Sequence, residues 1–483
     1  MLTDAPTIDR HRTALVRTDL SRPVRLALEH GLLPTGSTAF DYGCGHGGDV
    51  KRLQERGVPV GCWDPYYAAD QPLAESDLVN LGYVLNVIED TIERALALQR
   101  AWSLARRVLV VSAQLLVDQA GATKVPFGDG FLTRLNTFQR YFDHAELGAY
   151  IHETLGVEPL AAGLGVYYVF RHEEDGHAFR ARQFRRSARP AMVRLPKIEV
   201  HHNLVEPMLV FFRAHGRLPE PDELPEAPEI ASVFGSVPRA FAHVRRRTGP
   251  ELWDQLAADR REDLLVFLGL SLFKGRSRFG ALPTDLQRDV RAHLGNYTAA
   301  CKIADTLLFQ LRDQSQVAAA CRASPLGKRL PLALYVHASA MPRLVPLLRM
   351  YEGCARAYAG EIEGANLIKL HMHQAQVSYL SYPDFDADPH PALTQSVEVA
   401  MRDRSIRVVD YAKRENPPIL HRKELFVAED YPGREEMAAI TAAEEAAGLL
   451  DDTARIGTRE GWRAHQRSHS SQRAESWPIN PPD

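Results

Sequence analysis

The sequence predicts a doubly wound α/β domain followed by a mostly helical region. Three observations predict this fold class. The stretch AFDYGCGHGGDV at 39–50 places an acid and alternating glycines between an apolar run and a helix-like run. A second apolar run, VPVGCWDP, reaches another acid, Asp64. Farther on, LVEPMLVFFRAHG and EDLLVFLGLSLF repeat apolar residues at helical spacing.

Size and composition bound the protein class. The chain has 483 residues and is 45% hydrophobic, so we expect at least two domains, because single cores stop growing near roughly 250–300 residues. A net charge of −3 gives no general attraction to polyanions. The five scattered cysteines fit reduced thiols better than a zinc ribbon or disulfide framework. Without a signal-like N-terminus or a long apolar run, we expect a cytoplasmic protein that does not contact membranes.

The elements of the first domain follow from alternating apolar patterns and glycine or proline breaks. Residues 10–33 are predicted to be helical and to end at a Pro-Thr-Gly break. After it we expect a buried strand at 37–43, a helix at 50–57, a second buried strand at 58–65, a third strand at 77–88, a helix at 91–105, a fourth strand at 106–117, a helix at 143–155 and a β pair at 158–171.

Composition then changes along the chain. The α/β domain is predicted to span 1–172, and 173–197 is predicted to be a basic linker. Residues 198–436 are predicted to be mostly helical, with a proline-rich irregular stretch and the strand-like SIRVVDYA near their end. The remainder, 437–483, has too little apolar content to pack, and we expect a disordered tail.

The glycine loop indicates a cofactor. Glycines at 43, 45 and 47 let the backbone approach a ligand, and the next helix offers free N–H groups. Asp41 would repel a pyrophosphate but attract the ammonium of a methionine moiety. Asp64 ends the next strand, where a carboxylate can accept ribose hydroxyls, as it also does in dinucleotide enzymes. The two acids favour S-adenosylmethionine over NAD, and a tight turn without a ligand is the structural alternative.

Several stretches resemble known families. Residues 41–48, WDP at 63–65, NLGYVLNVIED at 80–90 and AWSLARRVLVVSA at 101–113 resemble class I S-adenosylmethionine-dependent methyltransferases. More narrowly, nearly the whole chain except the tail resembles the DNA phosphorothioation-associated methyltransferase family, through RHRTALVRTDLSRP at 10–23, DYGCGHGGD at 41–49, YPDFDADPHPAL at 382–393 and NPPILHRKE at 416–424.

The resemblance implies a Rossmann-like class I methyltransferase domain and a link to systems that replace a phosphate oxygen of DNA with sulfur. It implies partner proteins from such a system, but it does not supply a methyl acceptor. The cofactor-binding residues are expected to be Asp41, Gly43, Cys44, Gly45 and Gly47 at the methionine end and Asp64 at the ribose.

The sequence departs from the general fold in one place. Only twelve residues separate Asp64 from Asp77, too few for the usual helix and strand between them. The acid that normally binds adenine is therefore either missing or replaced by Asp77 or Asn86.

Asn80 and Tyr83 are the predicted catalytic residues. The phrase Asn80-Leu81-Gly82-Tyr83 ends a strand at the ligand edge and is similar to the (Asp/Asn)-Pro-Pro-Tyr signature of DNA amino-methyltransferases, without its prolines. In that signature the polar side chain and a carbonyl hold an amine while the ring stacks on a flipped base. Strand packing is the alternative. Asn416-Pro417-Pro418-Ile419 lacks the aromatic and is interpreted as a proline turn.

Two further groups of residues are candidates for binding sites. The set His371, His373, Asp384, Asp386, Asp388 and His390 has spacings that can serve a divalent cation, but a polar surface loop is favoured and no metal is predicted. DNA contacts are expected through Arg-rich patches, with solvated faces or a protein partner as alternatives. These patches are Arg10, Arg12, Arg17, Arg22 and Arg25, the aromatic-flanked 273–279, and Arg180, Arg182, Arg185, Arg186 and Arg189 of the linker.

Three functions remain open from the sequence. The leading hypothesis is an S-adenosylmethionine-dependent methyltransferase acting in DNA phosphorothioate modification. The second is a non-catalytic accessory or cofactor-sensing protein of the same system. The third is a methyltransferase for RNA or a small molecule.

Overall fold

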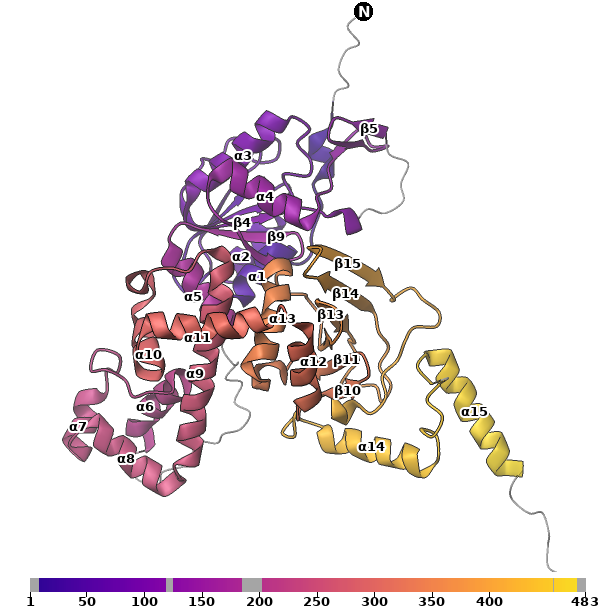
Figure 1. The fold of residues 1–483 in the computed structure, drawn as a ribbon. Coiled ribbons are helices and arrows are strands. Elements are labelled where there is room, and N and C mark those ends of the chain that lie inside the picture. The colour runs from indigo at the N-terminus through magenta and orange to yellow at the C-terminus, as the bar shows by residue number, and fades with distance from the viewer. Residues whose placement is uncertain (1–7, 119–124, 185–201, 455, 476–483) are drawn as a thin grey trace, which may run out of the picture. The chain divides into compact units, whose positions relative to one another are not determined.

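The computed structural model describes residues 8–118, 125–184, 202–454 and 456–475. The chain divides into two compact units (Figure 1). The first comprises Met1–Arg180 and Ala355–Glu363, and the second comprises Ala181–Cys354 and Gly364–Asp483. Among the described residues, no helix has the length and apolar character needed to cross a membrane.

A six-stranded sheet forms the centre of the first unit. Its strand order is β2-β1-β3-β4-β9-β8, with β2, β1, β3 and β4 parallel and β9 antiparallel to both β4 and β8. The strands are β1 (Ala39–Tyr42), β2 (Val60–Trp63), β3 (Ser76–Gly82), β4 (Ala105–Ser112), β8 (Leu160–Gly163) and β9 (Val166–Phe170).

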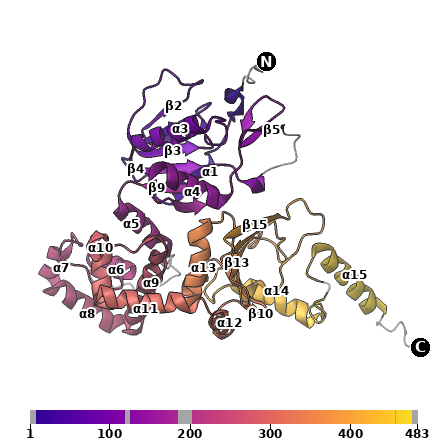
Figure 2. The same cartoon turned by 45° about the horizontal axis from the view of Figure 1, so that its top comes forward.

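Helices cover both faces of this sheet (Figure 2), as expected for a doubly wound fold. On one face, α3 (Thr91–Leu104) and α4 (His144–Leu155) pack against residues such as Val79 and Leu109. On the other face, α1 (Arg22–Glu29), α2 (Gly48–Glu55) and α5 (Glu173–Phe184) pack against strand side chains that point away from the first face. Leu78 and Val108 are two of these side chains. The period of two along each strand therefore produces two separate cores.

The strand order reverses direction beside β1. From β1 the chain passes to β2 on one side and then to β3 on the other. Such a switch point separates the connections at the carboxyl ends of the strands and leaves a crevice there. Asp41 and Asn80 are register partners across β1 and β3 at this point, so the topology brings the predicted loop and acceptor motif together.

The short connection between β2 and β3 lacks the helix and strand usual in this fold, as the sequence predicted. Within 64–75 there is only an isolated bridge between Asp64 and Ala68, with neither a helix nor a ladder strand. As a result β2 lies at the sheet edge. The prediction that β2 is a buried strand is wrong, because its residues are half-buried or exposed.

Other local predictions for the first unit need correction. Of the helix expected at 10–33, only a 3-10 turn (Arg10–Thr13) and α1 form, and the residues between them are not helical. A small sheet of β5 (Val125–Phe127), β6 (Gly130–Leu132) and β7 (Phe138–Gln139) was not predicted. The predicted basic linker begins as helix α5, where His177 and Phe179 are buried.

A distant segment completes the first unit. Residues 355–363 add hydrogen bonds from the Glu361 N–H to the Ala162 carbonyl (2.9 Å) and between His144 Nε2 and the Tyr358 carbonyl (2.9 Å). His30 Nε2 lies 2.9 Å from a Glu361 carboxylate oxygen. The backbones at Gly360 and Gly163 lie very close together, because a Cβ added to Gly360 would lie 2.2 Å from the backbone nitrogen of Gly163.

The second unit begins as predicted with helices. Two apolar clusters hold most of them, one around Phe212, Phe241 and Trp253 and one around Leu268 and Ala304. The helices are α6 (His202–His215), α7 (Ala227–Phe234), α8 (Val237–Thr248), α9 (Glu251–Ser271), α10 (Thr284–Leu294), α11 (Tyr297–Gln310), α12 (Gln314–Ala323) and α13 (Pro346–Ala359), whose last residues belong to the first unit.

Beyond α12 the prediction of a mostly helical region holds for α13 and fails for the strands on either side of it. A six-stranded sheet with antiparallel neighbours follows in the order β10-β11-β12-β13-β14-β15. Its strands are short, so their apolar runs carry little period by which a strand differs from a helix. They are β10 (Lys328–Leu330), β11 (Ala333–His337), β12 (Leu367–His371), β13 (Gln376–Ser381), β14 (Gln395–Ala400) and β15 (Ser405–Asp410), the last matching the predicted SIRVVDYA strand.

The C-terminal part is helical where the structure describes it. Helix α14 (Arg434–Ala446) and helix α15 (Arg459–Glu475) occupy much of the stretch that was expected to be disordered. Trp462 explains the error, because this single large side chain is 5% exposed and packs with Ile419, Leu450 and Ile456. One aromatic anchor outweighs a polar average composition here.

Candidate functional site

A cavity of about 900 Å³ opens at the carboxyl ends of β1, β2 and β3. Its walls include Asp41, Asp64 and Asn80, each at or just beyond the end of a different strand. The volume falls within the range of about 300–1,000 Å³ typical of small-molecule sites. Its place at the topological switch point is where open α/β sheets bind their ligands.

The glycine loop after β1 requires glycine for its backbone and for its packing. Gly43 has φ +81° and Gly45 has φ +51°, a region that other residues enter only at a cost. A Cβ on Gly43 would lie 2.4 Å from Cγ2 of Val84, and one on Gly45 would lie 3.0 Å from Cβ of Ala14. The loop is therefore held tightly against both sides of the cavity.

The N–H groups of the first three loop residues, Gly43, Cys44 and Gly45, are already used by the protein. Those of Gly43 and Cys44 donate to the Trp63 carbonyl at 2.7 and 3.2 Å. The Gly45 N–H donates to Oδ2 of Asp64 at 3.0 Å. Phosphate-binding loops leave such groups free for the anion. This arrangement disfavours a pyrophosphate and favours a cofactor without phosphate at the loop.

Asp64 fastens the loop as well as facing the cavity. Besides Gly45, its other oxygen, Oδ1, accepts the N–H groups of Tyr66 and Tyr67, both at 2.9 Å. An ionised carboxylate has about four acceptor positions, so three are filled and about one is left for a ligand hydroxyl. The sequence predicted only ribose binding for Asp64, and the structure shows that this residue also holds the glycine loop in position.

Asp41 and Asn80 form a buried polar pair at the switch point. Nδ2 of Asn80 donates to Oδ1 of Asp41 at 2.8 Å, and the two residues are 4% and 5% exposed, respectively. Within the described part of the chain, Oδ1 of Asn80 is buried without a hydrogen-bond partner. Burial and the negative charge of Asp49 raise the pKa of Asp41 to about 7. The pair thus offers two acceptor groups that a buried cation would satisfy.

The segment before α1 forms another wall. The Ser21 N–H donates to Oδ1 of Asp49 at 2.6 Å, which ties the segment to α2. The Tyr67 hydroxyl donates to the His11 carbonyl at 2.9 Å, and the His11 ring stacks on Tyr66 at 4.1 Å. These contacts join the N-terminal segment to the residues after Asp64, so it encloses the cavity instead of forming the predicted helix.

Tyr83 has a strained backbone at the cavity wall. Its φ of +63° is unusual for an aromatic residue. The Tyr83 N–H donates to the Ser112 carbonyl at 3.0 Å, which helps to fix this conformation. The Arg17 guanidinium lies 5.5 Å from the ring centroid, within cation–π range. Such strain costs about 1–3 kcal/mol and is concentrated at functional sites.

The cavity unites most of the predicted site residues. Gly47 is not on its wall but is the N-cap of α2, where a Cβ would meet open space. Sequence reasoning missed Asp49 and took Arg17 only as part of a basic patch. The predicted residues that line the cavity are Asp41, Gly43, Cys44, Gly45, Asp64, Asn80 and Tyr83.

Neither residue suggested for adenine is available for it. Asp77 does not line the cavity, and its Oδ2 accepts the N–H and hydroxyl of Thr38 at 2.8 and 3.0 Å. Asn86 lines the cavity, but its amide bonds the backbone of Gln114 and Arg140. Both side chains therefore hold the fold.

The N-terminal basic patch is largely neutralised. Arg10, Arg17 and Arg22 all line the cavity, and Arg17 also lies over the Tyr83 ring. The paired cations are Arg10 with Glu89 and Glu93, Arg12 with Asp9, and Arg22 and Arg25 with Glu363. A surface of paired charges offers little attraction to a phosphate backbone.

Some residues of the other predicted motifs interact with the rest of the protein or are buried in it. Arg276 of the 273–279 stretch pairs with Asp305. Burial lowers the pKa of the Arg180 guanidinium, and Arg185, Arg186 and Arg189 lie outside the described residues. In the proline turn, Oδ1 of Asn416 accepts the N–H of Glu460 at 2.9 Å.

Comparison with known proteins yields structural matches only. No protein-family model and no curated protein matches the chain. A Burkholderia thailandensis 1,6-didemethyltoxoflavin-N1-methyltransferase with bound S-adenosylhomocysteine is 15% identical, with 34% of this chain and 78% of that chain covered and a TM-score of 0.23. A Synechocystis magnesium protoporphyrin IX methyltransferase with bound SAM is 18% identical, with 31% of this chain and 76% of that chain covered and a TM-score of 0.22. The CcbJ methyltransferase from Streptomyces caelestis is 16% identical, with 34% of this chain and 93% of that chain covered and a TM-score of 0.24.

These TM-scores lie below 0.5, so the matches carry no argument about the function of this chain. The strand order and the helices on both faces establish the fold directly. The first unit has the doubly wound, Rossmann-like α/β fold predicted from the sequence.

Proposed function

We propose that the first unit binds S-adenosylmethionine in this cavity and transfers its methyl group. The observation that carries the proposal is the buried Asp41 beside a glycine loop in which the N–H groups of Gly43, Cys44 and Gly45 are bonded within the protein and so closed to phosphate. S-adenosylmethionine brings an ammonium and a sulfonium. Of the five acids on the cavity wall, Glu89 and Glu93 pair with Arg10, whereas Asp41, Asp49 and Asp64 suit a cation of this kind.

The residues divide into three binding roles. Asp41 and the unpartnered Oδ1 of Asn80 receive the ammonium, while Gly43 and Gly45 let the methionine end approach. Asp64 accepts a ribose hydroxyl with its remaining acceptor position. Because Nδ2 of Asn80 is committed to Asp41, the proposed role of Asn80 moves from the methyl acceptor toward the cofactor.

Tyr83 is the proposed acceptor-side residue. The bound cofactor supplies an electrophilic methyl group, and the protein aligns the acceptor, excludes water and takes a proton where one is lost. The Tyr83 ring, held by its strained backbone and flanked by Arg17, offers a surface for a flat acceptor such as a base.

The proposed biological setting rests on the sequence resemblance alone. We propose that the chain acts in DNA phosphorothioate modification, on DNA or together with proteins of that system. One observation favours the accessory alternative, in which the cofactor is bound without turnover. Asn80 is tied to Asp41, which leaves Tyr83 as the one acceptor residue named from the motif.

Calorimetry with S-adenosylmethionine and S-adenosylhomocysteine tests the cofactor site. We expect micromolar binding to the wild-type protein. Asp41→Ala removes the ammonium partner and should weaken binding at least tenfold, about 1.4 kcal/mol or more. Gly45→Val adds a side chain where a Cβ already lies 3.0 Å from Ala14 and should abolish binding.

Gly36→Val is the matched control for this experiment. Gly36 also has positive φ, at +87°, but a Cβ there meets nothing within 4 Å and the residue does not line the cavity. It should keep wild-type binding. Absence of binding to the folded wild type would exclude the cofactor and leave a scaffold. Labelled methyl transfer to plain DNA, phosphorothioated DNA or RNA then separates an enzyme from an accessory protein.

Cofactor binding is expected to depend on pH through Asp41. Below pH 7 this carboxyl, with a pKa of about 7, holds a proton that must leave when the ammonium binds. Affinity should therefore rise up to about tenfold per pH unit toward pH 7. It should fall again above about pH 8, where an α-amino group loses its own proton. Calorimetry from pH 5.5 to 9 measures both limbs.

Two comparisons isolate the cause of this pH dependence. Asp41→Asn should remove the acidic limb. In the wild type, 5′-methylthioadenosine, which lacks the ammonium, should bind without either limb. An unchanged acidic limb in Asp41→Asn would assign the titration to another group and contradict the role of Asp41.

A further inference from the structure

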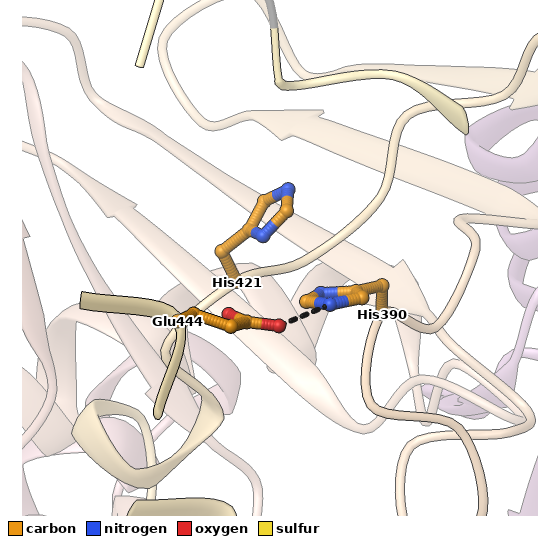
Figure 3. Close-up of side chains that lie close together, drawn as sticks. All are labelled: His390, His421 and Glu444. Atoms are coloured by element: carbon orange, nitrogen blue, oxygen red, sulfur yellow. Dashed lines mark hydrogen bonds and ion pairs between the residues drawn. The ribbon is translucent and has the colours of Figure 1, made fainter. Parts of the chain in front are cut away.

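Three potential metal ligands converge in the second unit (Figure 3). His390 lies in the loop between β13 and β14, His421 lies between β15 and α14, and Glu444 is on α14. Their ligand atoms lie within 4.8 Å of one another. In Figure 3 the Glu444 carboxylate points at the His390 ring, and the His421 ring lies beside them.

Backbone carbonyls fix the tautomers of both histidines. Nδ1 of His390 lies 3.2 Å from the Leu420 carbonyl, and Nε2 of His421 lies 2.8 Å from the Ile456 carbonyl. A carbonyl only accepts, so each of these nitrogens carries the hydrogen. In the neutral rings the lone pairs are then on Nε2 of His390 and Nδ1 of His421. Metal-binding histidines are oriented in the same way by their second nitrogen.

An unsatisfied atom indicates that a ligand belongs here. Nδ1 of His421 is buried and has no hydrogen-bond partner among the residues that the structure describes, and His421 is 9% exposed. An unpaired buried polar atom costs about 1–3 kcal/mol. A metal ion bound to this lone pair would remove that cost, whereas ordinary core packing would not.

Glu444 supplies the anionic ligand. Its Oε1 lies 2.7 Å from Nε2 of His390, and the two side chains are 13% and 15% exposed. Without a metal, a proton must lie between these two atoms. A cation can replace that proton, because both atoms are ligands for transition metals. At metal–ligand distances of about 2.0–2.2 Å, tetrahedral ligand atoms lie roughly 3.3–3.5 Å apart, so side-chain rotations close the site.

The surroundings shield the three side chains. The ring of Trp462 contacts both imidazoles at centroid distances of 4.7 Å. The guanidinium of Arg422, next to His421 in sequence, pairs with Glu445 at the surface, where the two side chains are 31% and 48% exposed. An apolar cover with anchored imidazoles is typical of a selective metal site.

We propose that His390, His421 and Glu444 bind one zinc ion in the second unit, with water as the fourth ligand. Two imidazoles and one carboxylate are ligands that zinc accepts. The ion would connect the loop at His390, the loop at His421 and helix α14, and so stabilise the C-terminal part of the unit. The sequence pointed to the Asp-rich stretch before His390 but not to its partners, since Glu444 is 54 positions away.

The test uses the full-length, tag-free protein after chelator treatment. Titration with zinc chloride followed by calorimetry should give one site per chain, and cobalt(II) at the same site should give visible absorption of a four-coordinate ion. Glu444→Gln and His421→Gln should each weaken zinc binding at least a hundredfold. Glu445→Gln, one residue along and paired only at the surface with Arg422, is the matched control and should keep wild-type affinity.

Stability provides a second readout. Zinc should raise the melting temperature of the wild type and of Glu445→Gln but not of Glu444→Gln. Circular dichroism establishes that each variant is folded before titration. No zinc bound by the folded wild type, or equal zinc binding by Glu444→Gln and Glu445→Gln, would overturn the proposal.

Discussion

Replacing Asp289 with asparagine is expected to lower the free energy of unfolding of the second unit by about 3–5 kcal/mol, the usual cost of breaking a buried ion pair. Asp289 on α10 is fully buried. Its carboxylate accepts from Nε of Arg217 at 2.7 Å, from Nη2 of Arg260 at 2.6 Å and from Nδ1 of His215 at 3.1 Å. The neutral amide leaves the two buried guanidinium groups without this charge.

Urea unfolding at pH 7 and at pH 2 measures this effect. Burial alone would raise the pKa of Asp289, but the His215 hydrogen bond and the charge of Arg260 bring it down to about 2. The unfolded value is about 3.9, so the stabilisation is present above pH 4 and is lost as the pH falls through 2. The difference in the free energy of unfolding between the wild type and Asp289→Asn should therefore be smaller at pH 2 than at pH 7.

Asp222→Asn is the control for the buried network. Asp222 pairs with Arg288 at 2.9 Å, but its side chain is 66% exposed, and such surface pairs contribute about 0–1 kcal/mol. A loss of stability in Asp289→Asn no larger than in Asp222→Asn would contradict the role assigned to Asp289.

Gly43→Ala is expected to weaken cofactor binding at least a hundredfold, about 2.7 kcal/mol. Two costs combine at this position. Alanine at φ +81° costs roughly 1–2 kcal/mol, and its Cβ would lie 2.4 Å from Cγ2 of Val84. The loop must shift, and with it the Gly43 N–H that donates to Trp63. Calorimetry with S-adenosylhomocysteine measures the loss.

A double variant separates the two costs. Val84→Ala removes Cγ2 and leaves Cβ of residue 84 at 3.7 Å, an ordinary contact. Gly43→Ala combined with Val84→Ala should therefore recover the part of the affinity that the clash removed, and the backbone cost should remain. If the double variant binds no better than Gly43→Ala, the close contact with Val84 is not the cause.

The sequence predicted the fold class of the first unit because the signals for it are local. An acid at a strand end, glycines with positive φ and an apolar strand lie within a few residues of one another, as Asp41 and Gly43 show. The site geometry is less local. The bonds from Asn80 to Asp41 and from Gly45 to Asp64 depend on which strands are neighbours, which residue spacing alone does not determine.

The sequence failed where distant partners decide the structure. Strand β13, QVSYLS, is almost entirely buried between β12 and β14, so it lacks the alternation of a half-exposed strand. Trp462 orders part of a polar tail through contacts with His390 and His421. Residues 10–21 follow their contacts with Asp49 and Tyr67 instead of their own helical spacing.

The return of residues 355–363 to the first unit affects how the protein is made. The partners of this segment, such as Ala162 and His144, leave the ribosome long before Tyr358 and Glu361. At roughly 5–20 residues per second, the intervening chain takes about ten seconds or more to synthesise. During that time the edge around Gly163 stays uncovered, so the nascent α/β unit completes its folding only after most of the second unit has emerged.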